Sequence, residues 1–398
     1  MIPNLDSLIG ISVYSTNFNG IGGKIRIKPE DFQVSELISE KAKKSIDDID
    51  GYAVYKLKKK RIDTNHALSD VFKKKGIRLK ALGLKDASAV TEQFVCAGNK
   101  GRGVDNFSTE KYSLEKLGHV KKPISKKDMI GNHFKIKISE CSDGLSSFED
   151  YEKTLNFYGY QRFGSKRPVT HLIGKAILQR DFKKAVELVL SFTSSYDSKE
   201  NTEIREKLLD PANYKKYLDE VPFQMDIERI VLSEMIEHGE PLKAIHAIPL
   251  SLRRFYIQAY QSYIFNQSLS SAFSDGENLF EAQVGDVCFD FKGIIGKYVK
   301  GMDQYLALPF VGYSYYKKTR FDYQISKILQ AEEIAPKDFF IKEMQEVSNE
   351  GGFRQAAIHC TDYSSHDDVV EFSLSRGSFA TILLREIMKP ENPMTAGF

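Results

Sequence analysis

One acidic residue stands in a setting suited to catalysis. Asp86 lies in the stretch Gly83-Leu84-Lys85-Asp86-Ala87-Ser88-Ala89-Val90-Thr91-Glu92-Gln93, between an apolar lead-in and the β-rich run Phe94-Val95-Cys96. An acid held between two buried strands is rigidly placed, as a nucleophile or a general base must be. The alternative is that Asp86 caps a turn or a short helix, because Asp is favoured at helix N-caps. The stretch alone leaves both roles open.

A second stretch combines aromatic, glycine and polar residues. It reads Asn156-Phe157-Tyr158-Gly159-Tyr160-Gln161-Arg162-Phe163-Gly164. Its amide and guanidinium groups could bond base edges or phosphates of a nucleic acid. The alternative is an aromatic corner of the core, a common use of such rings.

A third stretch near the N-terminus carries a cation at strand spacing. The run Lys24-Ile25-Arg26-Ile27-Lys28 alternates and predicts a half-buried strand with the three cations on one face. Pro29-Glu30-Asp31 is typical of a turn, and the run from Phe32 to Leu37 alternates again. On its own, Arg26 could equally be an exposed cation of the strand.

The rest of the chain supplies elements to position these residues. Tyr52 to Lys58 has a strand pattern, and Thr64 to Lys75 has the apolar spacing of a helix. Residues 97–128 predict a mobile basic loop and linker. Helical spacing dominates from about Asp181, and β character returns at residues 369–374 before a final helix.

Charge is distributed unevenly along the 398 residues. Residues 1–180 hold 33 Lys and Arg against 21 Asp and Glu, whereas residues 181–398 hold 24 against 33. A basic part joined to an acidic part indicates that one face meets a polyanion such as nucleic acid.

Several function classes are disfavoured. The four cysteines form no CxxC pair and the eight histidines form no HExxH pair, which argues against a zinc site and against a disulfide framework. The chain has no run of 18 or more apolar residues and does not begin like a signal peptide. We therefore expect a soluble, cytoplasmic protein without a bound metal or a membrane anchor.

Four separated motifs together resemble the TruD family of tRNA pseudouridine synthases. They are R-x-x-P-E-D-F-x-V-x-E from Arg26, G-L-K-D-x-x-A-V-T-x-Q from Gly83, N-F-Y-G-x-Q-R-F-G from Asn156, and G-S-F-A-T with a later R-E from Gly377. They follow the family's order over nearly the whole chain, and chance matches rarely do so. The resemblance implies an α+β fold with a mixed, largely antiparallel sheet. It implies a pseudouridine synthase core of residues 1–181 and 360–398, and a large inserted α+β domain of residues 182–359.

The resemblance also implies a chemistry and a set of roles. The reaction is the cofactor-free isomerisation of a uridine in tRNA, at uridine 13, with Asp86 as the catalytic carboxylate. Arg26 falls on the family's basic partner position, where other members often carry Lys, and a buried carboxylate needs such a cation. Phe32 would wall the pocket, Asn156 would supply an amide, and Tyr158 would stack on the target base.

We expect tRNA to be the partner, with no metal and no membrane, and the protein to be a monomer. The RNA-binding residues expected from the basic surface and the motifs are Lys59, Lys60, Arg61, Lys85, Gln161 and Arg162. Two other classes compete. A non-catalytic RNA-binding protein would not need an acid amid its basic surface, and a methyltransferase would need a glycine-rich turn for its methyl donor, which is not well placed here.

Overall fold

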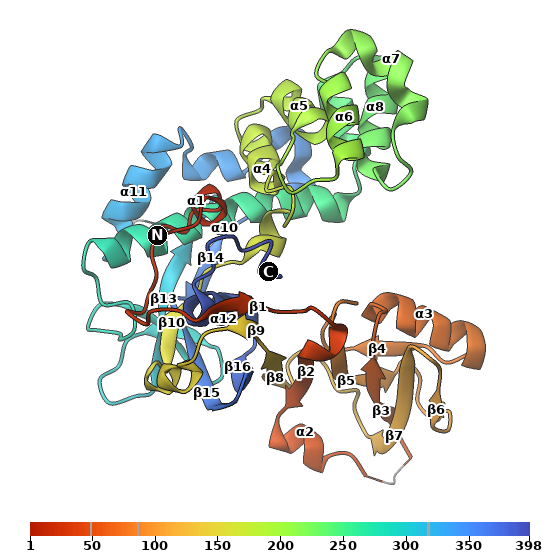
Figure 1. The fold of residues 1–398 in the computed structure, drawn as a ribbon, viewed down its shortest axis with the longest axis vertical. Coiled ribbons are helices and arrows are strands. Elements are labelled where there is room, and N and C mark those ends of the chain that lie inside the picture. Colours follow the sequence, from red (N-terminus) through yellow and green to blue (C-terminus); the bar gives the residue numbers. More distant parts are fainter. Residues whose placement is uncertain (48–49, 86, 317–318) are drawn as a thin grey trace.

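The computed structural model describes residues 1–47, 50–85, 87–316 and 319–398. Figure 1 shows three parts in a C-shaped arrangement. A central body lies on one side, a helical arm formed by α5 to α8 extends from its upper end, and a lobe built around β3, β7 and α3 extends from its lower end. The N-terminus lies beside α10, and the C-terminus lies near the middle of the molecule, between the arm and the lobe.

One large sheet runs through the central body and into the lobe. Its neighbouring strands are antiparallel except for β2 and β5, which are parallel. The predicted α+β class with a mixed, largely antiparallel sheet is therefore confirmed. In order across the sheet, the strands are β10 (Lys153–Leu155), β15 (Ala357–His366), β16 (Val369–Ser375), β8 (Met129–Lys137), β2 (Phe32–Ile38), β5 (Val90–Ala97), β3 (Tyr52–Lys59), β7 (Tyr112–Val120) and β6 (Phe107–Ser108), with β4 (Leu79–Ala81) paired to β5.

We call residues 52–127 the basic lobe, because they hold 19 Lys and Arg against 7 Asp and Glu. Alternate residues of its strands point to opposite faces of the sheet. Tyr55 packs in the apolar cluster beneath α3 (Thr64–Lys75), and the adjacent Val54 packs in a cluster on the other side with Ala42 of α2 (Glu40–Lys44). A helix thus covers each face, and both faces of the sheet are buried there.

The prediction of a mobile loop over residues 97–128 is wrong. Residues 112–120 form β7, which pairs with β3 along its length. Tyr112 and Leu114 are buried in the cluster beneath α3, so their side chains anchor the strand to the core. The charges of Lys111, Glu115 and Lys116 hid this alternation in the sequence, because they occupy positions between or beside the buried ones.

Helices and a small second sheet make up the rest of the molecule. The long helix α10 (Leu250–Ser274) packs against α4 (Thr170–Leu178). Their approach requires a glycine, since a Cβ on Gly174 would lie 2.1 Å from the Tyr256 carbonyl oxygen. The other α-helices of the described residues are α1 (Asn4–Leu8), α5 (Phe182–Ser191), α6 (Lys199–Lys207), α7 (Tyr214–Tyr217), α8 (Asp226–His238), α9 (Pro241–Ala247), α11 (Asp322–Ala331) and α12 (Ala380–Met388). The second sheet has the order β12 (Ile295–Lys297), β11 (Val287–Asp290), β13 (Gln304–Phe310) and β14 (Gly352–Gln355), and β1 (Gly22–Lys24) pairs with β9 (Ser139–Cys141).

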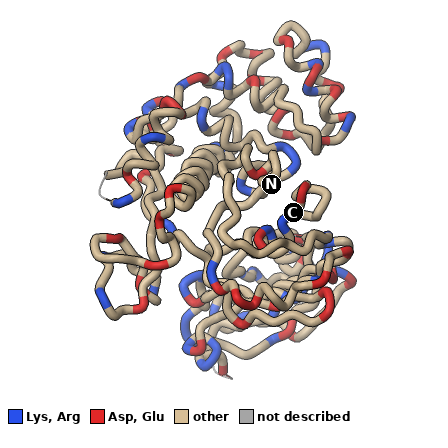
Figure 2. The backbone as a smooth tube through the Cα atoms, turned by 60° about the vertical axis from the view of Figure 1, so that its left-hand side comes forward, with Lys and Arg blue, Asp and Glu red and all other residues tan. Residues whose placement is uncertain are grey.

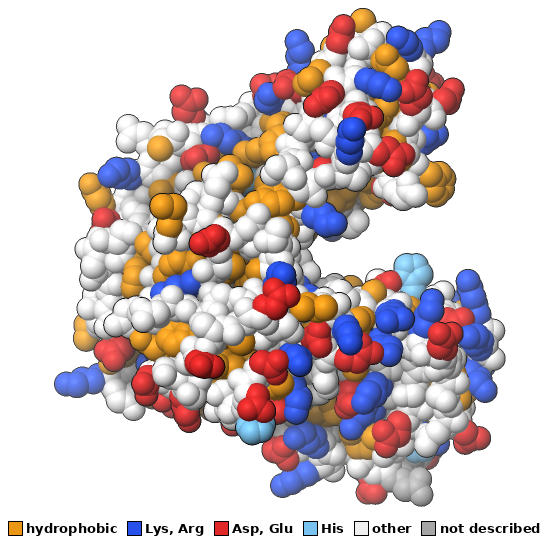
Figure 3. All heavy atoms as spheres, viewed as in Figure 1, with side chains coloured by type: hydrophobic (Ala, Val, Ile, Leu, Met, Phe, Trp, Pro, Cys, Tyr) orange, Lys and Arg blue, Asp and Glu red, His pale blue; other side chains and the backbone are white. Residues whose placement is uncertain are grey.

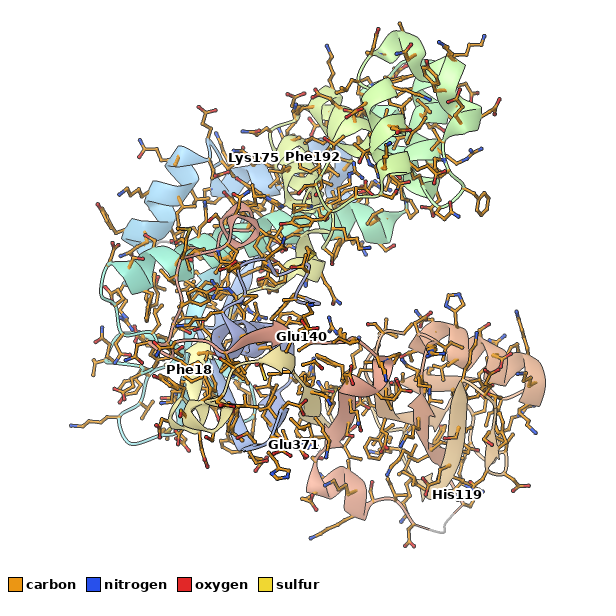
Figure 4. The ribbon with its side chains drawn as sticks, viewed as in Figure 1. Phe18, His119, Glu140, Lys175, Phe192 and Glu371 are labelled. Atoms are coloured by element: carbon orange, nitrogen blue, oxygen red, sulfur yellow. The ribbon has the colours of Figure 1, made fainter. Side chains whose placement is uncertain are left out.

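Polar contacts join α4 and the segment before it to α11 on one side and to α5 of the arm on the other. Lys175 of α4 donates to Glu332, which follows α11, at 2.8 Å. Arg167 donates from Nε to the carbonyl of Phe192, directly after α5, at 2.9 Å. Figure 4 shows Lys175 and Phe192 where the arm meets the body. The predicted domain division stays a prediction: its first boundary lies between α4 and α5, and its second lies within β15.

In the part of the chain that the structure describes, no helix has both the length and the apolar character needed to cross a membrane.

Candidate active site

The loop between β4 and β5 carries the Gly83–Gln93 motif. Asp86 itself lies outside the described residues, so its surroundings are defined here by its neighbours in the chain. The backbone N–H of Lys85 donates to the Thr64 hydroxyl at 2.9 Å. The Lys85 carbonyl accepts from the Lys59 ammonium at 3.0 Å and from the Thr64 N–H at 3.2 Å. The peptide groups on both sides of Lys85 are therefore fixed by the start of α3 and the end of β3.

Further hydrogen bonds connect Thr64 and Gly83 to Gln93 of β5. The Thr64 hydroxyl donates to Oε1 of Gln93 at 2.9 Å, and Nε2 of Gln93 donates to the Gly83 carbonyl at 3.0 Å. Lys59, Thr64 and Gln93 are each only 1% exposed. Because buried polar groups are costly when unpaired, this arrangement holds the loop in one conformation near Gly83 and Lys85.

The side chain of Lys85 points to the buried acid Glu36. Its ammonium donates to the Asn132 side-chain oxygen at 2.7 Å and lies 3.6 Å from Oε1 of Glu36. Glu36 is buried in β2 and also accepts from the Phe94 N–H at 2.9 Å. Burial raises the pKa of Glu36, and the nearby Lys85 opposes that shift. We call Glu36, Lys59, Thr64 and Gln93 the buried polar cluster.

Arg26 and Phe32 lie together, as their shared motif suggests. The guanidinium carbon of Arg26 is 4.3 Å from the centre of the Phe32 ring, a cation–π contact. Nη1 of Arg26 also donates to the Gly397 carbonyl at 3.2 Å. Phe32 is buried and meets Phe134 edge to face. Phe32 thus holds Arg26 against the body of the protein.

The motif at residues 156–164 is held by side chains distant in sequence. The Asn156 amide nitrogen donates to the Gln355 carbonyl at 3.0 Å, and its Oδ1 accepts from Nη2 of Arg354 at 2.7 Å. Asn266, within α10, bonds both backbone groups of Tyr158, at 2.8 Å and 3.1 Å. Asn156 and Tyr158 are therefore positioned from the second sheet and from α10.

The ring of Tyr158 lies in an aromatic cluster. Its centre is 5.8–6.0 Å from those of Phe265, Phe310 and Phe379. The guanidinium carbon of Arg354 lies 4.0 Å from the Tyr158 ring centre, and burial lowers the pKa of Arg354. We call these three phenylalanines, Tyr158 and Arg354 the aromatic wall. Tyr158 is only 9% exposed, so this ring meets a ligand only where its neighbours leave room.

Several motif residues meet at one cavity of about 300 Å³. The side chains and backbone that line it come from five separate stretches: Arg26, Gly159, Tyr160, Gln161, Arg162, Phe255, Phe379, Thr381 and Phe398. Arg162 lies over both Phe255 and Tyr158, at 5.1 Å and 5.2 Å from the ring centres. A cavity with aromatic walls and two guanidinium groups can hold an unstacked base next to a phosphate.

The residues expected to bind RNA fall into different environments. Gln161 and Arg162 line the cavity. Lys60 lies near the surface, where it pairs with Glu30 at 2.6 Å, and Arg61 is exposed. Lys59 and Lys85 differ from this expectation: their ammonium groups turn inward, Lys59 to the Ile62 and Lys85 carbonyls and Lys85 to Glu36 and Asn132. Both lysines therefore support the loop.

Sequence reasoning missed a buried ionic cluster beneath the cavity. Arg385 is fully buried; its Nε donates to Asp6 at 2.6 Å and its Nη1 to Glu386 at 3.1 Å. The Tyr160 hydroxyl donates to the other oxygen of Asp6 at 2.6 Å. This cluster ties the N-terminal segment and α12 to the turn that carries Gln161. Arg385 and Glu386 are the R-E of the last motif, so the sequence marked these two residues but did not indicate that they form a buried ionic cluster.

Arg354, Phe255 and Phe398 were also missed. Arg354 belongs to none of the sequence motifs. It contacts Asn156 only because β14 lies beside residues 156–158 in the fold. Phe255 sits in the first turns of α10, a long helix with many buried residues, where a lining residue looks like any core residue.

Within the described residues, no group of three or more His, Cys, Asp or Glu side chains is arranged to hold a metal ion.

A wide groove leads to this site. Figure 3 shows the molecule hollowed between the helical arm and the basic lobe, with Lys and Arg side chains spread over the lobe. Residues 182–238, which include α5 to α8, hold 8 Lys and Arg against 12 Asp and Glu. Both signs of charge are scattered over this arm (Figure 2). The lobe is therefore the side of the groove that attracts a polyanion.

Comparisons with known proteins agree with the motifs. Residues 8–387 match the family model described as tRNA pseudouridine synthase D (TruD). The chain is 31% identical to a protein of Pyrobaculum neutrophilum, with 100% of this chain and 99% of the relative covered, and 30% identical to one of Archaeoglobus fulgidus, with 97% and 100% covered. Both are named "Probable tRNA pseudouridine synthase D". A crystal structure from Methanosarcina mazei assigned to the same family superposes with a TM-score of 0.83 at 27% identity, over 99% of each chain. The chain belongs to the TruD family of tRNA pseudouridine synthases and is an isomerase.

Proposed function

We propose that this enzyme converts uridine 13 of tRNA to pseudouridine with Asp86 as its catalytic carboxylate. The observation that supports this most is the fixing of the loop on either side of Lys85 by the buried polar cluster. A loop held by so many buried hydrogen bonds suits a reactive group that must be placed within a fraction of an ångström.

The reaction needs no cofactor to balance. The C1′–N1 bond of the uridine breaks, the base turns, and a C1′–C5 bond forms, while the proton from C5 is lost and N1 gains one. The carboxylate of Asp86 attacks the nucleotide or removes a proton from its sugar. Arg26 supplies the positive charge that such a carboxylate needs nearby, and Phe32 keeps the guanidinium in place.

The aromatic wall holds the flipped base. A uridine inside a stacked helix cannot reach a carboxylate of the enzyme, so it must leave the stack. Phe379 lines the cavity and offers a ring to the base, while Tyr158 and Asn156 hold the wall behind it. Stacking on such a ring contributes about 1–3 kcal/mol.

The RNA lies in the groove against the basic lobe. Cationic residues of segments 56–80 and 98–127 contact its phosphates, so binding weakens as salt rises, by about one unit of log–log slope for each contact.

The experiment is incubation of an unmodified tRNA transcript with the purified protein and no cofactor, followed by chemical mapping of pseudouridine. We expect one modified position, uridine 13. Modification at another uridine would contradict the assigned site. If the protein binds the tRNA but forms no pseudouridine, it acts as an RNA-binding protein and not as an enzyme.

A further inference from the structure

A second cavity lies in the basic lobe, away from the candidate active site. It encloses about 360 Å³ at the C-terminal end of α3 and is lined by Phe72, Gly76, Ile77, Arg78, Asn99 and Arg102. That volume lies in the range of small-ligand pockets. The backbone N–H of Gly98 donates to the Arg78 carbonyl at 2.8 Å, so the two segments that form the walls are joined to each other.

The lining chemistry matches that of a nucleotide. Phe72 is 42% exposed, although it belongs to a helix whose other large apolar residues face the core. The guanidinium carbon of Arg78 lies 5.1 Å from its ring centre. Asn99 supplies an amide that can donate and accept at a base edge. An exposed ring beside a guanidinium and an amide offers stacking, charge and hydrogen bonding together.

The charge of the two arginines is not neutralised locally. In the described part of the lobe, Lys74 and Lys100 pair with Asp70 and Asp50, at 2.8 Å and 2.9 Å. Neither Arg78 nor Arg102 forms an ion pair with a carboxylate of the described residues. The cavity thus keeps two guanidinium groups for an anion, and a phosphate suits the planar fork of donors that each guanidinium presents.

The cavity is too far from the catalytic loop to hold the target uridine. Helix α3 begins at Thr64, which bonds Lys85, and ends at Lys75, next to the cavity. Its 12 residues span about 18 Å at 1.5 Å per residue. A nucleotide in the cavity therefore belongs to another position of the bound RNA.

We propose that this cavity binds an unpaired nucleotide of the RNA substrate, distinct from the target uridine. The base stacks on Phe72, the phosphate lies between Arg78 and Arg102, and Asn99 faces the base edge. This inference rests on the proposed function for the identity of the RNA. It adds a second site, besides the one for the target uridine, at which the enzyme recognises a nucleotide of its substrate.

The test compares tRNA binding and single-turnover isomerisation for Phe72→Leu and Arg102→Gln. Phe72→Leu keeps an apolar side chain but removes the stacking ring, and we expect the Kd for an unmodified tRNA transcript to rise about tenfold. Arg102→Gln should reduce the salt slope by about one unit. At saturating enzyme the isomerisation rate should stay within twofold for both, because neither residue lies at the catalytic loop.

Matched controls come from exposed positions outside the lobe's cavity. Phe291→Leu changes a more exposed ring, 75% exposed, and Lys300→Gln removes an exposed cation outside the basic lobe; neither should reproduce the tenfold loss or add to it. An unchanged Kd for Phe72→Leu would overturn the proposal, as would an equal loss for Phe291→Leu. If only Arg102→Gln weakens tRNA binding, the cavity contacts a phosphate but does not stack a base. That result would also reject a nucleotide site.

Photocrosslinking identifies the occupant. Irradiation of the wild-type complex should join Phe72 to one nucleotide that is unpaired in the tRNA and is not the modified uridine; a crosslink to the modified uridine would contradict the proposal. If the wild-type protein binds tRNA and Phe72→Leu weakens that binding, but no pseudouridine forms, the proposed function fails while the nucleotide site stands.

Discussion

The two regions that carry the candidate active-site residues, the basic lobe and the central body, are held by different forces. On the lobe side, the loop before Asp86 is fixed by directional hydrogen bonds among buried polar groups, from Thr64, Lys59 and Gln93. On the side of the central body, Tyr158 is held by ring packing and by the guanidinium of Arg354. The first arrangement sets the path of a backbone, and the second sets the planes of rings.

This difference suggests how each side fails. Hydrogen-bonded positions lose their geometry when one atom is removed, because a buried partner is then left unsatisfied. Packed rings tolerate changes that keep their shape but respond strongly to the loss of a whole side chain.

Among the changes that compare the two sides, the largest effect is expected for Arg354→Ala. This change leaves Oδ1 of Asn156 without its donor and removes the cation from the face of Tyr158, so the wall should shift. We expect the single-turnover rate to fall about a hundredfold, equivalent to ~2.7 kcal/mol. We also expect the free energy of unfolding to fall by about 1.5–3 kcal/mol. Arg354→Lys should recover part of the stability but little of the rate, because lysine lacks the planar fork.

The matched control for this prediction is Arg229→Ala. Arg229 is partly buried in α8 of the arm and donates to the Val221 carbonyl at 2.9 Å, remote from the wall. Equal rate losses for Arg354→Ala and Arg229→Ala would argue against a special role for the wall.

On the lobe side, Thr64→Val should lower the single-turnover rate about tenfold. The change removes the hydroxyl that accepts from the Lys85 N–H and donates to Oε1 of Gln93, at a cost of about 1–3 kcal/mol in unfolding free energy. The affinity for tRNA should not change, because Thr64 is buried.

Thr91→Val is a close control for that change. Thr91 is equally buried in β5, yet its hydroxyl has no hydrogen-bond partner among the residues that the structure describes. The same substitution should therefore be neutral or stabilising there. If both variants behave alike in urea unfolding and in rate, hydrogen bonding does not hold the loop.

Acid should weaken the side of the molecule that carries the aromatic motif. His171 of α4 packs between Phe163 and Tyr263, and burial lowers its pKa from 6.5 to about 4. The folded state then binds fewer protons than the unfolded chain between those values, so its stability is lost as pH falls through that window. The full loss of stability, reached below both pKa values, amounts to about 3 kcal/mol. His171→Phe should remove this contribution, which is measured as a flatter fall in unfolding free energy between pH 7 and pH 4; an unchanged slope would place the titration elsewhere.

The lobe should respond to pH with the opposite sign, and more weakly. Burial raises the pKa of Glu36 above 4.5, so the folded state keeps a proton that the unfolded chain releases. This contribution to stability is present below 4.5 and is lost as pH rises through the folded pKa. Glu36→Gln should flatten that part of the curve and change the unfolding free energy by about 1 kcal/mol or less at acidic pH. A steeper curve in the variant would show that the sign is wrong.

Local patterns were enough to predict much of the fold. The alternation at residues 32–37 and 369–374 predicted β2 and β16, and the spacing from Thr64 to Lys75 predicted α3 with its bounds. Strand β7 was not predicted, because charged residues interrupt its alternation of buried and exposed positions. Its position in the sheet depends on pairing with β3, which no short window of sequence contains.

The candidate site was predicted in part, for a similar reason. Motif positions such as Arg26 and Arg162 do line one cavity. Arg354 and Asp6 were missed because each acts through a partner almost 200 or more residues away: Asn156 for the first and Arg385 for the second. The inward turn of Lys59 and Lys85 was also hidden, since burial depends on tertiary packing.

The central claim is that the fixed loop serves the carboxylate of Asp86. Its most direct test is single-turnover formation of pseudouridine in a tRNA transcript by Asp86→Asn, alongside tRNA affinity and thermal unfolding. Asn is nearly the same size but cannot act as a carboxylate, so we predict wild-type affinity and stability with the rate reduced at least about a thousandfold, or ~4 kcal/mol. A rate within about tenfold of the wild type, a loss of only ~1.4 kcal/mol, would contradict the account and remove Asp86 from the chemistry.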